Sequence, residues 1–183
     1  MKKDILVIGF IILFISIILS GTKIQSVDEY YLTHADDIQE DSQTVWLTID
    51  CSTILDNWEK LPEKLQDEKY VPKDGKILDR TEYVLRPGDT VFDILNRAVR
   101  QNKIHMEYQG ADKNAYSSVY IQGINHLYEF TCGELSGWMY EVNGEVPNYG
   151  CSRYELEDGD EIAFLYTCDL GADIGCDWMG GGQ

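Results

Sequence analysis

The sequence predicts an α+β fold: a β-grasp-like mixed sheet covered by one main amphipathic helix, preceded by an N-terminal membrane or signal segment. Three observations indicate this class. Residues 161–168 carry apolar side chains on both faces, which is typical of a strand in the middle of a sheet. Residues 44–51 alternate apolar and polar side chains, as a half-buried strand does. The strongest helix pattern lies between them, after a second strand, and this succession is the β-grasp order.

The first part of the predicted domain alternates strands with irregular segments. Residues 44–51 form the first strand, and a short helical turn follows until Pro62 ends it. Residues 64–76 are polar and contain a turn at Asp74-Gly75, so we expect a linker there. Residues 80–85 are the second strand.

The helix follows this second strand and has both a start signal and a periodic apolar face. Thr90, with Asp93 three residues later, resembles a capping box. The apolar residues that follow recur at helical spacing and form one continuous stripe: Val91, Ile94, Leu95, Ala98 and Val99. This pattern predicts a helix that packs one face on the sheet.

Short strands and turns make up the rest of the domain. Three further strands are expected, at residues 104–108, 118–124 and 127–131. Residues 138–142 alternate in polarity and end in Asn143-Gly144, the dipeptide that most readily forms a type I′ hairpin turn. A loop at residues 147–150 and a turn at Asp158-Gly159 then lead into the last strand.

The N-terminus has the pattern of a targeting segment. Lys2 and Lys3 precede an apolar run at residues 5–19, so residues 1–22 are a signal peptide or an uncleaved signal anchor. The lysines favour a cytoplasmic N-terminus and place the rest of the chain outside. We therefore expect the protein on the extracellular face of the cell membrane, or secreted if the leader is cleaved.

Three segments follow the leader. Residues 23–43 are acidic and poor in apolar side chains, which predicts a solvated extracellular tether. Residues 44–176 form the single folded domain, and the glycine-rich residues 177–183 form a flexible tail. The chain has 15 basic and 32 acidic residues, a formal net charge of −17. Such a charge excludes nucleic acid and anionic lipid headgroups as electrostatic partners.

The order of short motifs in the last third of the domain points to a family. The motifs are G-W-M-Y-x-V-N-G, P-N-Y-G-C-S-x-Y, D-G-D-x-I and Y-T-C-D-L-G. This order resembles the transcobalamin-like C-terminal domain, a domain of unknown function in Gram-positive surface proteins that is similar to the β-domain of the animal cobalamin carriers. The resemblance covers about residues 45–175 and implies a β-grasp-like fold, with cobalamin or a related corrinoid as a ligand.

A group of aromatic and amide side chains is the candidate ligand-binding site. Its members are Trp138, Tyr140, Asn148, Tyr149 and Tyr154. The resemblance implies that Trp138 is a flat apolar wall for a planar ligand, with polar groups beside it; packing of Trp138 on the domain's own core is the alternative. The carriers cover the other face of their ligand with a large helical domain, which this chain lacks. A second protein, such as a membrane transporter component, would have to cover it.

The five cysteines are the other candidate site, because cysteines outside the cell tend to oxidise in pairs. In a β-grasp arrangement the first and last strands are adjacent, so Cys51 and Cys168 are expected to form one disulfide. Cys132 and Cys151 would then form a second, leaving Cys176 over. A metal site and free thiols remain open alternatives, although no C-x-x-C spacing is present.

No catalytic motif is found, so we expect no enzyme. His34, His105 and His126 are scattered, which indicates surface or packing roles and no metal. Three functions remain: a tethered module that binds a small planar ligand for a transporter, a module that binds a surface protein or wall polymer, and a thiol redox protein.

Overall fold

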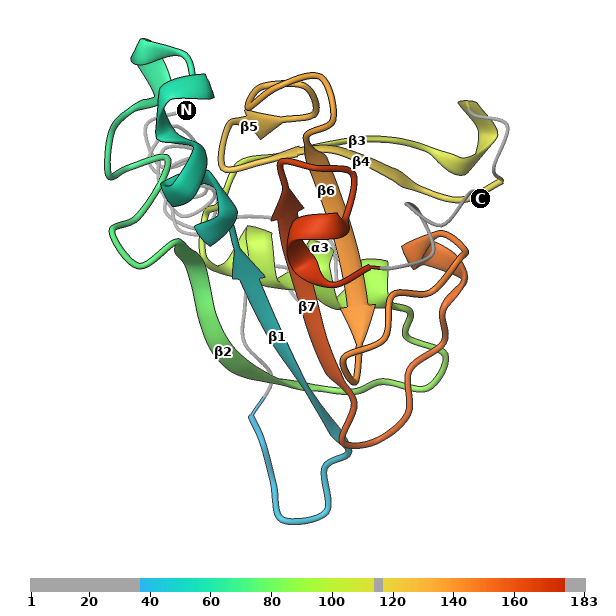
Figure 1. The fold of residues 1–183 in the computed structure, drawn as a ribbon. Coiled ribbons are helices and arrows are strands. Elements are labelled where there is room, and N and C mark those ends of the chain that lie inside the picture. The colour runs from blue at the N-terminus through green and yellow to red at the C-terminus, as the bar shows by residue number, and fades with distance from the viewer. Residues whose placement is uncertain (1–36, 114–116, 177–183) are drawn as a thin grey trace, which may run out of the picture. The chain divides into compact units, whose positions relative to one another are not determined.

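A four-stranded mixed sheet forms the centre of the structure, a computed structural model (Figure 1). Its strands are β1 (Thr44–Asp50), β2 (Lys76–Val84), β6 (Gly137–Val142) and β7 (Glu161–Thr167), in the order β2-β1-β7-β6. β1 and β7 run parallel, whereas β2 and β6 run antiparallel to their neighbours. The mixed sheet of the predicted α+β fold is confirmed, and so is the central position of the last strand.

The structure describes residues 37–113 and 117–176. The predicted leader (1–22), residues 23–36 of the predicted tether and the predicted tail (177–183) lie outside these ranges. Within them, no helix is long and apolar enough to cross a membrane.

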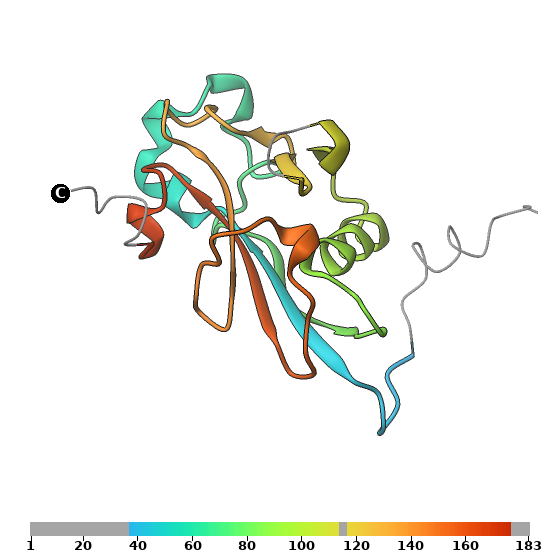
Figure 2. The same ribbon diagram turned by 90° about the vertical axis from the view of Figure 1, so that its right-hand side faces the viewer.

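The helix α3 (Val91–Gln101) packs on one face of this sheet (Figures 1 and 2). Its capping box is present: the backbone N–H of Asp93 donates to Thr90 Oγ1, and the backbone N–H of Thr90 donates to Asp93 Oδ2 at 2.9 Å. All five residues of the predicted stripe are buried. They share one apolar cluster with the inward side chains of β1 and β7: Val45, Leu47, Ile49, Ile162 and Phe164. The helix prediction is therefore confirmed in position, cap and packing face.

A three-stranded antiparallel sheet completes the core beside α3. It consists of β3 (Met106–Gln109), β4 (Tyr120–Ile124) and β5 (Leu127–Tyr128), in that order. Ile121 and Ile124 of β4 are buried in the same cluster as the helix stripe. The predicted strands at 104–108, 118–124 and 127–131 exist, but the last is only two residues long.

The predicted hairpin after β6 is present only as a turn. Asn143 and Gly144 adopt the positive φ angles that a type I′ turn needs, 55° and 79°. A single bridge joins Val142 to Glu145 across it, however, and the strand that pairs along the whole of β6 is β7. The local turn signal was correct, but the hairpin expected from it is reduced to this one bridge.

The segment between β1 and β2 is more ordered than predicted. It contains η1 (Ser52–Lys60) and η2 (Glu63–Leu65), both 3₁₀ helices. Leu65 and Val71 are buried in a second apolar cluster, so the prediction of a polar linker at residues 64–76 was wrong. Strand β2 also begins at Lys76, earlier than expected. The remaining elements of the described residues are three short 3₁₀ turns: η3 (Ala111–Lys113), η4 (Cys151–Arg153) and η5 (Ala172–Ile174).

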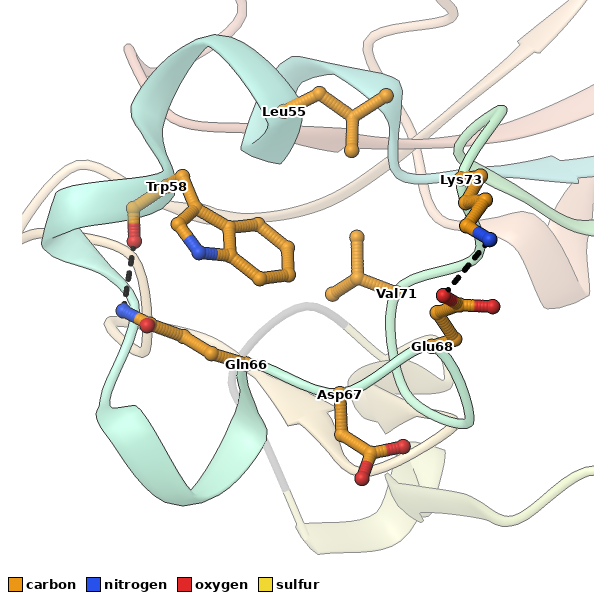
Figure 3. A pocket seen from close by; sticks show the side chains of 7 residues that line it. All are labelled: Leu55, Trp58, Gln66, Asp67, Glu68, Val71 and Lys73. Carbon is orange, nitrogen blue, oxygen red and sulfur yellow. Dashed lines mark hydrogen bonds and ion pairs between the residues drawn. The ribbon is translucent and has the colours of Figure 1, made fainter.

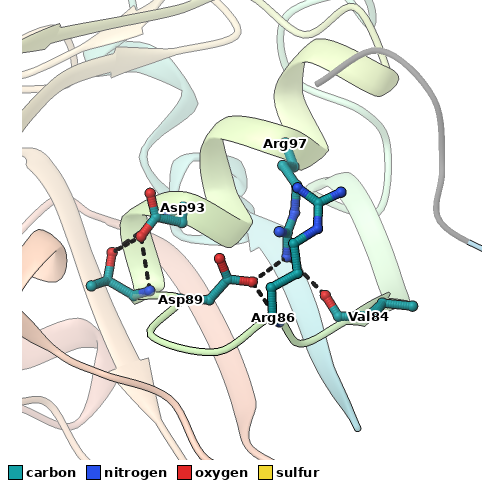
Figure 4. A network of polar contacts seen from close by, with 6 residues as sticks. Val84, Arg86, Asp89, Asp93 and Arg97 are labelled. Carbon is teal, nitrogen blue, oxygen red and sulfur yellow. Dashed lines mark hydrogen bonds and ion pairs between the residues drawn. The ribbon is translucent and has the colours of Figure 1, made fainter. Parts of the chain in front are cut away.

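A buried ion pair joins the end of β2 to α3 (Figure 4). The guanidinium of Arg97, only 4% exposed, donates to Asp89 Oδ2 at 2.7 Å and to the carbonyl of Val84 at 2.8 Å. Asp89 Oδ2 also accepts from the backbone N–H of Arg86 at 2.8 Å. The loop between strand and helix is thus held by charges that are shielded from water.

We expect Arg97→Ala to lower the free energy of unfolding by about 3–5 kcal/mol, because it leaves the Asp89 carboxylate buried without its cation. Urea unfolding followed by circular dichroism measures the loss. Arg100→Ala, an exposed arginine on the same helix, is the matched control and should change stability by less than about 0.5 kcal/mol. Equal losses in the two variants would contradict a stabilising role of the pair.

Candidate functional site

A cavity of about 400 Å³ lies beside the edge strand β6. Its walls come from three stretches that are distant in the sequence: the start of β4, strand β6, and the loop that follows β6. The lining residues are Ser118, Val119, Tyr120, Trp138, Met139, Tyr140, Val146, Pro147, Asn148, Tyr149, Gly150 and Arg153. The cavity therefore combines aromatic faces with amide, hydroxyl and guanidinium groups.

Trp138 belongs both to the cavity wall and to the core. Its indole is half-buried, and its Nε1 donates to the carbonyl of Leu127 at 2.7 Å. The ring of Tyr166 meets it edge-on, with 5.2 Å between the centroids. These contacts hold the indole in one orientation. Both readings of Trp138 from the sequence, packing on the core and lining a groove, apply together.

Three tyrosines support the other side of the cavity. The hydroxyl of Tyr140 donates to the carbonyl of Tyr149 at 2.6 Å, which ties strand β6 to its loop. Tyr149 is 46% exposed and stacks on Tyr154, with 5.6 Å between centroids and 9° between planes. Burial raises the pKa of the Tyr140 phenol well above its usual range, which is consistent with a hydroxyl enclosed by the protein that donates to a carbonyl.

The loop after β6 is anchored to β4 through serine hydroxyls. Ser152 Oγ lies 2.9 Å from Ser118 Oγ and accepts from the backbone N–H of Val119 at 2.9 Å. Gly150 sits directly against this contact, and a Cβ at this position would lie 1.9 Å from Ser118 Oγ. Only glycine allows the two segments to approach this closely.

The structure brings four of the five predicted ligand-binding residues to one cavity: Trp138, Tyr140, Asn148 and Tyr149. Tyr154 does not line it but supports Tyr149 from behind. Sequence reasoning missed residues 118–120 and Arg153, because no local pattern links the start of β4 to β6. Ligand binding by these residues stays a prediction.

A larger cavity, of about 640 Å³, lies beside η1 (Figure 3). Several of its polar groups already have partners within the protein. The amide of Gln66 donates to the carbonyls of Trp58 and Leu61, and Lys73 pairs with Glu68 at 3.0 Å. We favour the smaller cavity as the candidate site, because the aromatic faces gathered there are a better match to a specific ligand than an exposed ion pair.

The cysteines differ from the predicted pairings. All five are free thiols in the structure, so neither predicted disulfide is present. Cys132 lies in the second apolar cluster and Cys151 in the main one, and their Sγ atoms contact the carbonyls of Asn57 and Val119 respectively. The pairing of Cys132 with Cys151 is therefore wrong for this fold. Cys51 and Cys168 do share a cluster, as the parallel strands require.

Two of the histidines, predicted to be scattered, stack on each other. The rings of His105 and His126 lie 4.1 Å apart at 15°, because the backbone N–H of Asn125 bonds the His105 carbonyl at 2.7 Å. His105 Nε2 lies 3.5 Å from Glu107 Oε1, and its buried Nδ1 has no hydrogen-bond partner within the described residues. In residues 37–113 and 117–176, no group of three or more metal-ligating side chains is found.

Comparisons with known proteins give a family match over part of the chain. Residues 88–167 match a family model described as "Domain of unknown function (DUF4430)". The match lies inside the stretch that resembles the transcobalamin-like C-terminal domain. A comparison with the curated proteins gave no match.

Two solved structures are distantly similar. One is haptocorrin in complex with Cbi, with 12% identity, a TM-score of 0.48 and 74% of this chain covered; the chain spans only 27% of haptocorrin. The other is a "putative metal binding protein from Ruminococcus gnavus ATCC 29149", with 10% identity, a TM-score of 0.40, and 68% of this chain and 96% of that chain covered. At these identities and scores, neither likeness identifies a ligand of this chain.

We expect Gly150→Ala to destabilise the protein by about 1–3 kcal/mol, because the new methyl group overlaps Ser118. The backbone of Gly150, at φ −72° and ψ 149°, suits any residue, so the overlap is the sole cause. The double variant with Ser118→Gly should recover part of the loss in thermal unfolding. Gly137→Ala, whose Cβ would have 3.8 Å to its nearest neighbour, is the control. Equal effects of the two alanines would contradict the close approach.

The pKa of His126 should lie below its ordinary 6.5, first because packing against the rings of Tyr70 and His105 partly desolvates this otherwise exposed imidazole, and second because of the charge of His105. The folded protein then binds fewer protons than the unfolded chain, so this site's contribution to stability is present above pH 6.5 and decreases as the pH falls below it. NMR titration of the imidazole signals measures the midpoint. His105→Gln should raise it and Glu107→Gln should lower it further; shifts of the opposite signs would exclude this electrostatic coupling.

Proposed function

We propose that the chain is a binding module, tethered to the extracellular face of the cell membrane, that captures a small planar ligand and passes it to a transporter component. The observation that carries the proposal is the cavity of about 400 Å³ beside β6, which Trp138, Tyr140 and Tyr149 all line. We further propose that the module holds its ligand without transforming it, on a β-grasp-like scaffold.

The chemistry of the cavity favours a ligand with flat apolar faces and a polar edge. Aromatic rings that are already fixed in place can stack on such a ligand with little loss of side-chain freedom. Trp138 is fixed by its bond to Leu127, and Tyr149 by its stack on Tyr154. The Asn148 amide and the Arg153 guanidinium, both in the lining, offer donors to the ligand's edge.

A corrinoid is the ligand that the resemblance to the transcobalamin-like domain suggests for Trp138. A cavity of about 400 Å³ is near the lower limit of ordinary ligand pockets and would cover only one face of so large a ring. An uncovered face remains in water and gives little burial to offset the freedom lost on binding. We therefore propose that a second protein, such as the transporter component, covers the other face.

A second candidate is a module that binds a surface protein or a wall polymer through the same region. The observation that favours it is the position of β6 at the edge of the sheet, where β7 is its one neighbouring strand among the described residues. An edge strand can accept an added strand from a partner chain. The aromatic loop beside it would then contact side chains of that partner.

Titration of the 183-residue chain with cobinamide and with cobalamin tests the first proposal, with calorimetry and tryptophan fluorescence as readouts. Tyr149→Ala should weaken binding about fivefold, as expected for about 1 kcal/mol of lost stacking. Tyr149 is suited to this test because its ring is 46% exposed. Leu135→Ala, 50% exposed and outside the cavity lining, is the matched control and should bind as the unchanged chain does.

Two results would count against the corrinoid ligand: no heat or fluorescence change at high micromolar concentration, or equal weakening by both alanines. A surface protein that is crosslinked to the chain, and lost when residues 147–150 are changed, would favour the second candidate. Thermal unfolding of each variant shows whether a loss of binding reflects a loss of fold.

A further inference from the structure

We infer that Cys132 and Cys168 form an oxidisable thiol pair, and that their disulfide joins the end of β7 to the loop after β5. This inference does not rest on the proposed ligand. It replaces the pairings expected from the sequence, which joined each of these cysteines to a different partner.

Both thiols lie against the same 3₁₀ helix, η1. The thiol of Cys168 contacts Thr53 Oγ1 at 3.8 Å, and the thiol of Cys132 contacts the carbonyl of Asn57 at 3.6 Å. Thr53 and Asn57 are four residues apart and joined by a bond from the Asn57 amide to the Thr53 carbonyl at 2.9 Å. Figure 1 shows the C-terminal end of β7 close to η1 and to the loop after β5.

A chain of hydrogen bonds fixes the two backbone segments relative to each other. The hydroxyl of Tyr166, two residues before Cys168, donates to the Tyr128 carbonyl at 2.7 Å and lies 3.0 Å from Ser136 Oγ. Ser136 Oγ accepts from the backbone N–H of Cys132 at 3.0 Å. The two segments are therefore already neighbours, and a disulfide needs no change of topology to form.

The thiols also interact directly. Cys132 donates a hydrogen bond to Cys168, and this bond lowers the pKa of Cys168. The same bond, followed by burial, raises the pKa of Cys132. Cys168 is thus the group that ionises first. It is also the more accessible of the two, at 7% exposure against 0% for Cys132. Both properties make Cys168 the attacking sulfur.

Oxidation proceeds by exchange with a low-molecular-weight disulfide, RSSR. The Cys168 thiolate attacks one sulfur of RSSR, which forms a mixed disulfide and releases the first RS⁻. Cys132 then loses its proton and attacks the Cys168 sulfur, which releases the second RS⁻. In sum, two protein thiols and RSSR give one protein disulfide and two RSH, so atoms and electrons balance.

The remaining cysteines are poorly placed to compete. Cys51 is fully buried in the same cluster, but within the described residues its thiol bonds neither Cys132 nor Cys168, whereas those two thiols bond each other. Cys151 lies in the other apolar cluster. Cys176 packs beside Gly171, whose added Cβ would lie 2.9 Å from the Cys176 Cβ.

The test incubates the folded 183-residue chain with oxidised glutathione, alkylates the remaining thiols and maps the peptides by mass spectrometry. Trypsin leaves Cys132 with Cys151, and Cys168 with Cys176, because no Lys or Arg separates them. Glu-C and Asp-N cut between the members of each pair, at Glu134 and Asp169 for example, and so identify the linked sulfurs. The expected product has lost two hydrogens and contains one crosslink, Cys132 to Cys168.

Two variants test which cysteines form the crosslink. Cys51→Ser should still form the crosslink, whereas Cys132→Ser should stop at the mixed disulfide, with one glutathione retained on Cys168. Oxidation should raise the thermal unfolding midpoint by roughly 5–10 °C, since the disulfide closes a long loop of the unfolded chain. A crosslink from Cys51 to Cys168, or no loss of hydrogens in the folded wild-type chain, would overturn the inference.

Discussion

The parallel pairing of β1 with β7 is the constraint on which the rest of the structure depends. Leu47 lies opposite Ile162 and Ile49 opposite Phe164, and all four side chains are buried against α3. A slip of one residue would turn every one of them to the other face of the sheet, so this register is strongly determined. The pairing also leaves β6 on the outer side of β7, where its aromatic side chains border a cavity and not a further strand.

The sequence predicted the elements whose signals are local. Helix α3 has a cap and an apolar stripe within twelve residues of Thr90. Both are present in the structure, because their sequence signals are local and do not depend on distant partners. The partner of β6 was not predictable in the same way. Asn143 and Gly144 satisfy a turn locally, but the pairing of β6 is decided by contacts with β7. Leu65 and Val71 were missed because isolated apolar residues in a polar segment show no period.

The residues of the candidate site also divide into those whose grouping is visible in the sequence and those that only the fold brings together. Trp138 and Tyr140 share a strand, and Tyr149 follows within a short loop, so their grouping was visible in the chain. The contribution of residues 118–120, the stack of His105 on His126 and the contact of Cys132 with Cys168 are set by the fold alone. Each joins segments that no spacing rule connects. The predicted cysteine pairings differ from the structure for this reason: the strand order located Cys51 and Cys168, but not the loop that brings Cys132, like Cys168, against η1.

The strand order also has a consequence for biosynthesis. The last strand in the described part of the chain, β7, occupies the middle of the sheet, so β1 and β6 cannot pair with it until almost the whole domain has left the ribosome. Pairing between such distant segments makes folding slow and strongly cooperative. The four-stranded sheet of this domain is therefore completed only at the end of synthesis. Any polypeptide that is threaded through a translocation pore before it folds benefits from such a delay.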